Sequence, residues 1–173
     1  MKPAIWNQEF GIWNSCGMIR DYEPHHRHQL RACLVELQDF ERSLEPPLPE
    51  GEQMADAYLA SLFEKCARWC GKVFVAEVDD AIVGFVGVLS RVPPEAPDEA
   101  RADYAYISDL VVLPPYRQQG IAGALLDHAE AFACANGAKT LRIGVLARNL
   151  IALNLYHRRG FLDYHVQLVK VLR

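Results

Sequence analysis

The sequence predicts a mixed α/β fold in which a central, mostly antiparallel sheet carries helices on both faces. Two observations support this class. Strand-like and helical patterns follow each other in the order β-α-α-β-β-β-α-β-α-β-β. The chain of 173 residues, 51% hydrophobic and 23% charged, is long enough for one sizeable core. We therefore expect a single domain over residues 1–173, with residues 1–17 as a poorly ordered N-terminal extension.

The first part of the chain predicts one short strand and two helices. Residues 18–20 form the strand, and Pro24 opens a helix. The apolar stripe of this helix consists of Leu30, Cys33, Leu34, Leu37 and Phe40. Three prolines within residues 45–51 end it, and a second helix is expected over residues 53–70, closed by Gly71.

The next segment predicts three strands. Residues 72–78 and 81–89 are separated only by Asp79 and Asp80, which is the length and residue type of a tight antiparallel hairpin. Residues 91–103 hold three prolines and four acidic residues and are expected to form an exposed loop. A further strand then covers residues 104–112.

The last part predicts two helices and three strands. A helix begins at Ile121 and is capped by Asn136-Gly137, with Ala122, Leu125, Leu126, Ala129 and Phe132 on its buried face. Residues 141–145 form a strand and residues 149–159 a helix that Gly160 stops. A final pair of strands is expected from Phe161 onward.

Composition excludes several classes of function. The net charge of −4 and the pI near 5.8 give no global positive field for nucleic acid or an anionic membrane. No apolar run is long enough to span a membrane, and no secretory signal is evident, so we expect the cytoplasm. The five cysteines are an odd number without a C-x-x-C pair, so no metal is expected.

The segment that leads into the third helix has the features of an anion-binding turn. It carries a strand into a helix whose first N–H groups have no intrahelical partner. Gly120 allows close approach of a phosphate, Ala122 and Gly123 keep the first turn bare, and the helix dipole favours negative charge. Alone, R-x-x-G-x-A is a weak signal, and an ordinary turn explains it as well. It is neither a P-loop nor a G-x-G-x-x-G motif.

A second pattern about thirty residues downstream makes the combination specific. It contains Asn149, Ala152, Leu155, Tyr156, Gly160 and Phe161. With the glycine turn upstream, the sequence resembles the GNAT superfamily of acetyl-CoA-dependent N-acetyltransferases over roughly residues 19–168. Ala122 stands where many relatives have glycine. The resemblance implies a GNAT-type sheet that is splayed between its fourth and fifth strands.

The resemblance also implies a set of binding residues for acetyl-CoA as co-substrate. Backbone groups of Leu110, Val111 and Val112 would bind the pantetheine arm, and Asn149 would bond to the same arm. The pyrophosphate would lie on a loop formed by Arg117, Gln118, Gln119, Gly120, Ile121, Ala122 and Gly123.

Tyr156 is the candidate general acid. Acetyl transfer from a thioester expels a thiolate, whose parent thiol has a pKa near 8.5, and a positioned phenol can protonate it. The competing interpretation is a core aromatic on an apolar helix face beside Ala152 and Leu155.

Asp109 is the candidate proton acceptor for the attacking amine, since a free alkyl amine is protonated at neutral pH. Strand alternation puts Tyr104, Tyr106 and Ser108 on one face and Ile107 and Asp109 on the other, unless a bulge shifts the register. A structural carboxylate that caps a backbone group is an equal alternative.

Charge is divided unequally along the chain. Residues 1–104 contain 10 Lys+Arg and 18 Asp+Glu, a net charge of −8, and residues 105–173 contain 8 and 4, a net of +4. A basic half suits a phosphate-bearing cofactor and an acidic half a cationic acceptor, although solvated helix faces explain the division equally well. The acidic residues on the expected acceptor side are Glu36, Asp39, Glu41, Glu45, Asp56, Glu95, Asp98, Glu99 and Asp103.

We therefore expect an N-acetyltransferase that moves acetyl from acetyl-CoA to a primary amine of a small, cationic acceptor by direct attack. Two alternatives remain open: a non-catalytic acyl-CoA-binding sensor or interaction module, and a protein lysine or N-terminal acetyltransferase. The sequence does not name the acceptor, and it leaves homodimer formation open.

Overall fold

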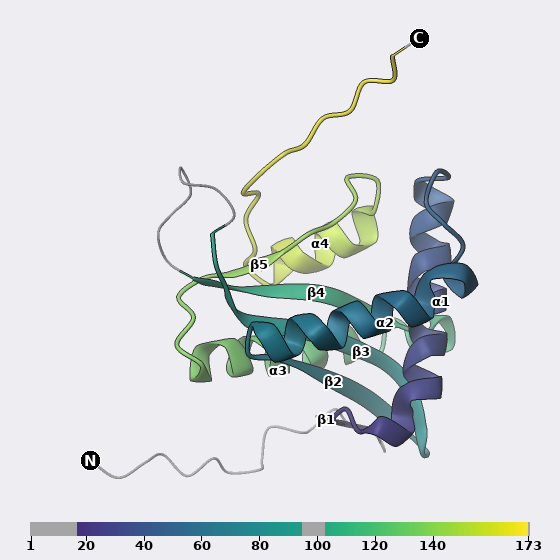
Figure 1. The fold of residues 1–173 in the computed structure, drawn as a ribbon, viewed down its shortest axis with the longest axis vertical. Coiled ribbons are helices and arrows are strands. Elements are labelled where there is room, and N and C mark those ends of the chain that lie inside the picture. The colour runs from purple at the N-terminus through teal and green to yellow at the C-terminus, as the bar shows by residue number, and fades with distance from the viewer. Residues whose placement is uncertain (1–16, 95–102, 173) are drawn as a thin grey trace.

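The computed structural model describes residues 17–94 and 103–172, which form one five-stranded sheet with helices on both faces (Figure 1). The strands, in spatial as in chain order, are β1 (Gly17–Asp21), β2 (Gly71–Val78), β3 (Ala81–Val92), β4 (Tyr104–Val112) and β5 (Leu141–Ile143). The helices are α1 (Arg27–Leu44), α2 (Gly51–Arg68), α3 (Ile121–Ala135) and α4 (Leu150–Arg158). All pairs are antiparallel except β4 with β5, which is parallel, so the expected fold class is confirmed.

Most element boundaries lie within a few residues of the expected ones. Asp79 and Asp80 have φ angles of 48° and 62°, as a two-residue hairpin turn with positive φ requires. Gly137, also at positive φ, follows the last turn of α3. The helix α2 begins at Gly51 rather than at residue 53, and β3 continues to Val92, into the segment expected as a loop.

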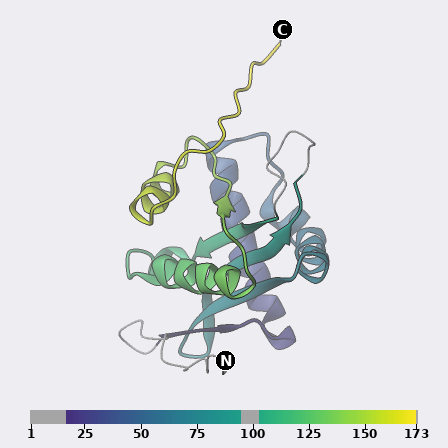
Figure 2. The same ribbon diagram turned by 90° about the vertical axis from the view of Figure 1, so that its left-hand side faces the viewer.

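The sheet is buried on both faces (Figure 2). On one face, α1 and α2 cover β2, β3 and β4, with Leu30, Leu34, Leu59, Leu62, Val75 and Phe85 in the core. On the other face, α3 packs against the same strands, with Ile121, Leu125, Leu126, Val83, Val86 and Ile107 in the core. Burial on both faces explains why β2 and β3 are almost continuously apolar.

The strands β4 and β5 part soon after they meet. Pairing is limited to Ala105–Ile107 of β4 with the three residues of β5, which ends two residues earlier than expected. At the point of separation β4 contains a bulge: Gly87 of β3 is opposite Asp109 and Val88 is opposite Ile107, so Ser108 has no partner. The remainder of β4 thus has an edge that no strand of the described residues covers.

The expected final pair of strands is wrong for this chain. Phe161 packs against the core, but residues 162–172 contain no strand and are exposed. A strand needs a neighbour for its backbone N–H and C=O groups, and this segment leaves the sheet after α4 (Figure 1).

Within residues 17–94 and 103–172, no helix is long and apolar enough to cross a membrane.

Candidate active site

The glycine turn lies directly before α3 and has the backbone geometry of an anion cradle. Gln118 and Gly120 both have positive φ, 63° and 86°. The first intrahelical bond runs from the Ala124 N–H to the Gly120 carbonyl, 3.0 Å, so the N–H groups of the three residues between them have no intrahelical acceptor. A Cβ at Gly120 would have no heavy atom within 4 Å. The turn therefore leaves open space in front of a helix N-terminus, which fits a pyrophosphate.

The Arg117 side chain is directed away from this cradle and toward α1. Its Nε donates to the Val112 carbonyl at 2.9 Å, and its guanidinium pairs with Glu36 at 3.0 Å. The guanidinium also lies 5.5 Å from the ring centre of Phe40. These contacts hold the turn against α1, so the Arg117 side chain positions the loop in this structure.

A second arginine lies at the first turn of α3. Arg159, which follows α4, donates to the Gly123 carbonyl at 2.7 Å and pairs with Asp127. A Cβ at Gly123 would lie 3.6 Å from this guanidinium. The first turn is therefore covered on this side by a positive charge, which the sequence analysis did not assign to the site.

The backbone of β4 is open along residues 110–112. Leu113 N–H donates to Val83 of β3, and the Val111 carbonyl oxygen faces Gly84 of β3. Since backbone groups alternate in direction along a strand, those of Leu110 and Val112 face the other edge. The geometry thus favours Leu110 and the Val112 N–H over Val111 as backbone partners for an extended ligand, since the Val112 carbonyl already accepts from Arg117.

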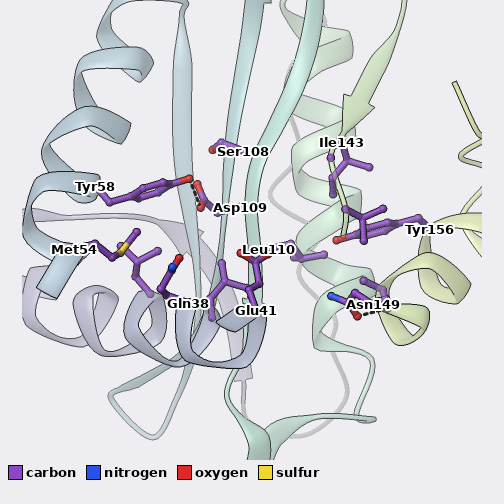
Figure 3. Close-up of a pocket in the computed structure, with 15 residues that line it drawn as sticks. Gln38, Glu41, Met54, Tyr58, Ser108, Asp109, Leu110, Ile143, Asn149 and Tyr156 are labelled. Atoms are coloured by element: carbon purple, nitrogen blue, oxygen red, sulfur yellow. Dashed lines mark hydrogen bonds between the residues drawn. The ribbon is translucent and has the colours of Figure 1, made fainter. Parts of the chain in front are cut away.

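A cavity of about 120 Å³ lies where β4 and β5 part (Figure 3). Its walls come from α1, α2, β4, the end of β5 and α4. The polar lining consists of Gln38, Glu41, Tyr58, Ser108, Asp109, Asn149 and Tyr156. Tyr58 and Tyr156 face the cavity from opposite sides. Both predicted catalytic residues, Asp109 and Tyr156, thus line the same cavity.

Asp109 is buried at 5% exposure on the α2 side of the sheet. Its Oδ1 accepts a hydrogen bond from the Tyr58 hydroxyl at 2.8 Å. Burial raises the pKa of this carboxyl, and the Ser108 and Tyr58 hydroxyls and the Lys65 charge oppose the rise only in part. Although the Ser108 hydroxyl adjoins the carboxyl, within the described residues neither its Oγ nor Asp109 Oδ2 has a partner with hydrogen-bond geometry.

The bulge at Ser108 determines where Asp109 points. Regular alternation put Ile107 and Asp109 on one face; instead, Ile107 packs in the core beneath α3, while Asp109 contacts α2 on the opposite face. The sequence left open that a bulge shifts the register and separates Asp109 from Ile107, and the structure shows such a bulge.

Glu41 brings a second carboxyl to the cavity, from the last turns of α1. Burial, followed by the charge of Asp109, raises the pKa of Glu41. From the sequence, Glu41 was expected among the acidic residues of the acceptor side, with no role assigned to it in the site. Its spacing from Leu34 and Leu37 puts it on the apolar stripe of the helix, and Tyr58 similarly continues the stripe of α2 with Met54. A polar residue within an apolar stripe was the available signal for both.

Tyr156 and Asn149 approach from α4. Tyr156 is 7% exposed, its ring lies 5.8 Å from that of Phe161, and burial raises its pKa to about 12. Asn149 caps α4 by accepting from the Ala152 N–H at 3.1 Å through its side-chain oxygen. This bond orients the Asn149 amide and directs its NH₂ group away from the cap.

Four of the six described acidic residues expected on the acceptor side have local partners. Glu36 pairs with Arg117, Glu45 lies 3.8 Å from Arg148, and Asp56 pairs with Arg31. Asp39 accepts from the Gly51 N–H at the start of α2. Glu95, Asp98 and Glu99 lie outside the described residues, and Asp103 is exposed. Among the described acids, Glu41 is the one that joins Asp109 in lining the cavity.

No group of three or more His, Cys, Asp or Glu within the described part of the chain could hold a metal ion.

Comparisons with known proteins agree with this geometry. Residues 34–161 match the acetyltransferase (GNAT) family. The uncharacterized N-acetyltransferase YhfO of Bacillus subtilis (strain 168) is 28% identical over 109 residues, which cover 63% of this chain and 68% of YhfO.

Solved structures share the fold. AAC(6')-Iy in complex with the bisubstrate analogue CoA-S-monomethyl-acetylneamine has a TM-score of 0.67 at 21% identity, covering 92% of this chain and 99% of its own. A GCN5-related N-acetyltransferase from Ralstonia eutropha JMP134 has a TM-score of 0.68 at 19% identity, covering 90% and 98%. AAC(6')-Iy has also been solved in complex with CoA, with a TM-score of 0.66 at 20% identity. The chain therefore belongs to the acetyltransferase (GNAT) family of acyltransferases.

Proposed function

We propose that this acetyltransferase transfers acetyl from acetyl-CoA to the primary amine of a small acceptor that carries a second positive charge. The observation that carries the proposal is the cavity itself. It brings two carboxyls, Glu41 and Asp109, and the Tyr156 phenol to the end of the open edge of β4.

Acetyl-CoA supplies an activated acetyl thioester, and three features of the chain support its binding. The turn around Gly120 offers backbone N–H groups and open space to a pyrophosphate. The open backbone of Leu110 and Val112 can pair with an extended arm, as a neighbouring strand would. The Asn149 amide, fixed by its cap, lies at the cavity end of the same path.

Asp109 is proposed to accept the proton of the attacking amine, directly or through one water. An amine with a pKa near 10.4 must lose a proton before its nitrogen can attack the carbonyl carbon. A carboxyl whose pKa is raised by burial is a stronger base than an ordinary carboxylate. Tyr58 holds one oxygen of Asp109, which leaves Oδ2 for the proton.

Tyr156 is proposed to donate a proton to the departing sulfur. With a pKa of about 12, its phenol is protonated at all physiological pH values. A protonated phenol that lines the cavity can therefore supply the proton that the departing thiolate needs.

Glu41 is proposed to bind the second positive charge of the acceptor. The cavity of about 120 Å³ has room for more than one water-sized group, so it can take the acetyl group and the amine-bearing end of an acceptor. The remainder of the acceptor must pass Glu41, whose carboxylate is partly desolvated and thus attracts a cation more strongly than a solvated one.

The test compares acceptors and variants together. Thiol release from acetyl-CoA is measured with a series of diamines and with monoamines of matched length, and products are identified by mass spectrometry. We expect higher kcat/KM for the diamines. Glu41→Gln should reduce kcat/KM for diamines about tenfold, mainly through KM, and change the monoamines little.

The matched control is Glu45→Gln, on the same helix end but beside Arg148. If Glu41→Gln and Glu45→Gln behave alike, Glu41 does not bind the acceptor. If acetyl-CoA binds but no amine is acetylated, the chain is the non-catalytic sensor and the proposed function is wrong.

A homodimer and a cytoplasmic location remain predictions.

A further inference from the structure

The turn before α3 adopts a backbone conformation that needs support from its surroundings. Gln118 has a φ of 63°, in the left-handed region that residues other than glycine rarely adopt, and Gly120 follows at 86°. A side-chain-bearing residue stays in this region only where neighbouring contacts enforce it. The residue directly before Gln118 is Arg117, and its side chain makes such contacts.

The Arg117 side chain ties the turn to two other elements. Its Nε donates to the carbonyl of Val112 at the end of β4, 2.9 Å away. Its Nη2 donates to Glu36 of α1 at 3.0 Å, and the guanidinium lies 5.5 Å from the ring centre of Phe40. Because a guanidinium is rigid and planar, these contacts together fix the direction in which the chain enters Gln118.

The helix α1 therefore presents a receptor for this guanidinium. Glu36 and Phe40 are four residues apart, so they lie on one face of the helix. The carboxylate accepts a charge-assisted hydrogen bond, and the ring adds a cation–π contact. The Glu36 and Arg117 side chains are 34% and 40% exposed, so solvent screens the ion pair only in part. The turn thus depends on a residue of α1 that lies 81 positions away in the sequence.

The bond to Val112 also marks the end of the open edge of β4. The Val112 carbonyl is already occupied by Arg117, so an extended ligand that pairs with Leu110 and the Val112 N–H cannot continue the same pairing further. The next group of the ligand meets the turn instead. In acetyl-CoA, the group that follows the extended arm is the diphosphate.

We propose that Glu36 is a positioning residue for acetyl-CoA, which holds Arg117 and thereby keeps the backbone N–H groups of the turn directed at the diphosphate. The Glu36 carboxylate acts through Arg117 and does not itself contact a phosphate. From the sequence, Glu36 was expected among the acids of the acceptor side, and its contact with Arg117 transfers it to the coenzyme side. This inference rests on the proposed pyrophosphate site at the turn.

The positioning role predicts an effect opposite in sign to that of simple electrostatics. A carboxylate near an anion-binding site repels the anion, so by charge alone its removal strengthens the binding of CoA. Removal of Glu36 also frees Arg117 to reach a phosphate, which acts in the same direction. If Glu36 positions the turn, its removal weakens the binding of CoA, because the turn loses its anchor on α1.

The first experiment measures CoA binding to the full chain by calorimetry. We expect Glu36→Gln to raise the Kd for CoA about fivefold, as loss of a partly exposed ion pair allows. The matched control is Glu52→Gln, which removes the same carboxylate from an ion pair with Arg31 on the α2 side, 2.8 Å long, and should leave the Kd unchanged. Unchanged or tighter CoA binding in Glu36→Gln overturns the proposal.

The second experiment is a double-mutant cycle between Glu36 and Arg117. Arg117→Gln loses the contacts to Val112, Glu36 and Phe40 together, so the Kd for CoA should rise about tenfold or more. Because Glu36 acts through Arg117, the double variant should bind CoA no more weakly than Arg117→Gln alone. Losses that add fully would show that Glu36 acts independently of Arg117, and would overturn the proposal.

The third experiment identifies the part of the coenzyme that the contact serves. The kcat/KM is compared for acetyl-CoA and for S-acetylpantetheine, which has the thioester and the arm but no diphosphate. Glu36→Gln should lower the value for acetyl-CoA about fivefold, mainly through KM, and leave the value for S-acetylpantetheine unchanged. A variant that is merely destabilised loses activity with both donors, and that outcome overturns the positioning role.

The positioning role and the proposed function fail in distinguishable ways. CoA binding that Gly120→Glu abolishes but Glu36→Gln leaves intact disproves the positioning role alone. A chain that binds CoA but acetylates no amine disproves the proposed function, and the two calorimetric experiments still decide the role of Glu36.

Discussion

Replacement of Tyr156 by phenylalanine separates a proton donor from a core aromatic. The ring is 7% exposed and packs against Phe161, and Phe keeps both contacts. Within the described residues no protein group is hydrogen-bonded to the phenol hydroxyl, so its removal leaves no partner unsatisfied. We expect Tyr156→Phe to change the free energy of unfolding by less than about 0.5 kcal/mol.

The expected effect on catalysis is much larger. Loss of a general acid costs about 10²-fold in kcat, which corresponds to ~2.7 kcal/mol of transition-state stabilisation. The KM for acetyl-CoA should change little, because the turn at Gly120 is untouched. The expected loss of transition-state stabilisation therefore exceeds the expected change in the free energy of unfolding by several times the error of either measurement.

The assay is thiol release under saturating acetyl-CoA, together with urea unfolding. Tyr22→Phe is the control, because Tyr22 packs beside Phe63 on the opposite face of the sheet. With a pKa of about 12, only about one Tyr156 phenol in a thousand is ionised at pH 9. Equal kcat in Tyr156→Phe and wild type would refute the reasoning and leave Tyr156 as a core aromatic.

Three further predictions concern the cradle, the proton acceptor and a buried thiol. Gly120→Glu should abolish acetyl-CoA binding in calorimetry. Gly137→Glu is the control, because Gly137 has the same φ of 86° and equally open surroundings at the other end of α3, and it should leave binding intact. Equal loss of binding in both variants would indicate backbone strain instead. Asp109→Asn should lower kcat about 10²-fold. Because the pKa of Asp109 is raised, the native state binds more protons than the unfolded state in this pH range. The stability of the wild type should therefore fall as the pH rises from the ordinary carboxyl pKa through the raised one. Asp109→Asn should lack this fall when urea unfolding is measured as a function of pH. Cys33, buried and with a pKa of about 12, should resist iodoacetamide at pH 8 until the chain unfolds, as mass spectrometry can show; rapid native labelling would contradict its burial.

Sequence periodicity was sufficient for the elements that depend on local chemistry. The Asp79-Asp80 turn, the cap at Gly137 and the stripes of α1 and α3 follow from residue type and spacing within a few positions. The candidate pyrophosphate turn is of the same kind, since positive φ at Gly120 and a bare first helical turn are encoded locally.

Features that depend on a neighbour were not predictable in the same way. The bulge at Ser108 exists because β3 and β4 pair out of step, and neither strand alone shows it. Glu41 and Tyr58 reach the cavity only because α1 and α2 cross the same end of β4. The C-terminal segment alternates like a strand, but residues 162–172 form none, because alternation alone does not supply a neighbouring strand.

The bulge at Ser108 makes β4 two half-strands of opposite phase, joined by one unpaired residue. Before it, Ile107 packs beneath α3; after it, Asp109 and Val111 contact the other face. If β4 kept Ser108 but paired with β3 without the bulge, regular alternation would put Asp109 on the face of Ile107 and withdraw the carboxyl from Tyr58. The register between two strands, rather than the identity of Asp109 alone, thus decides whether a carboxyl reaches Tyr58 and the cavity.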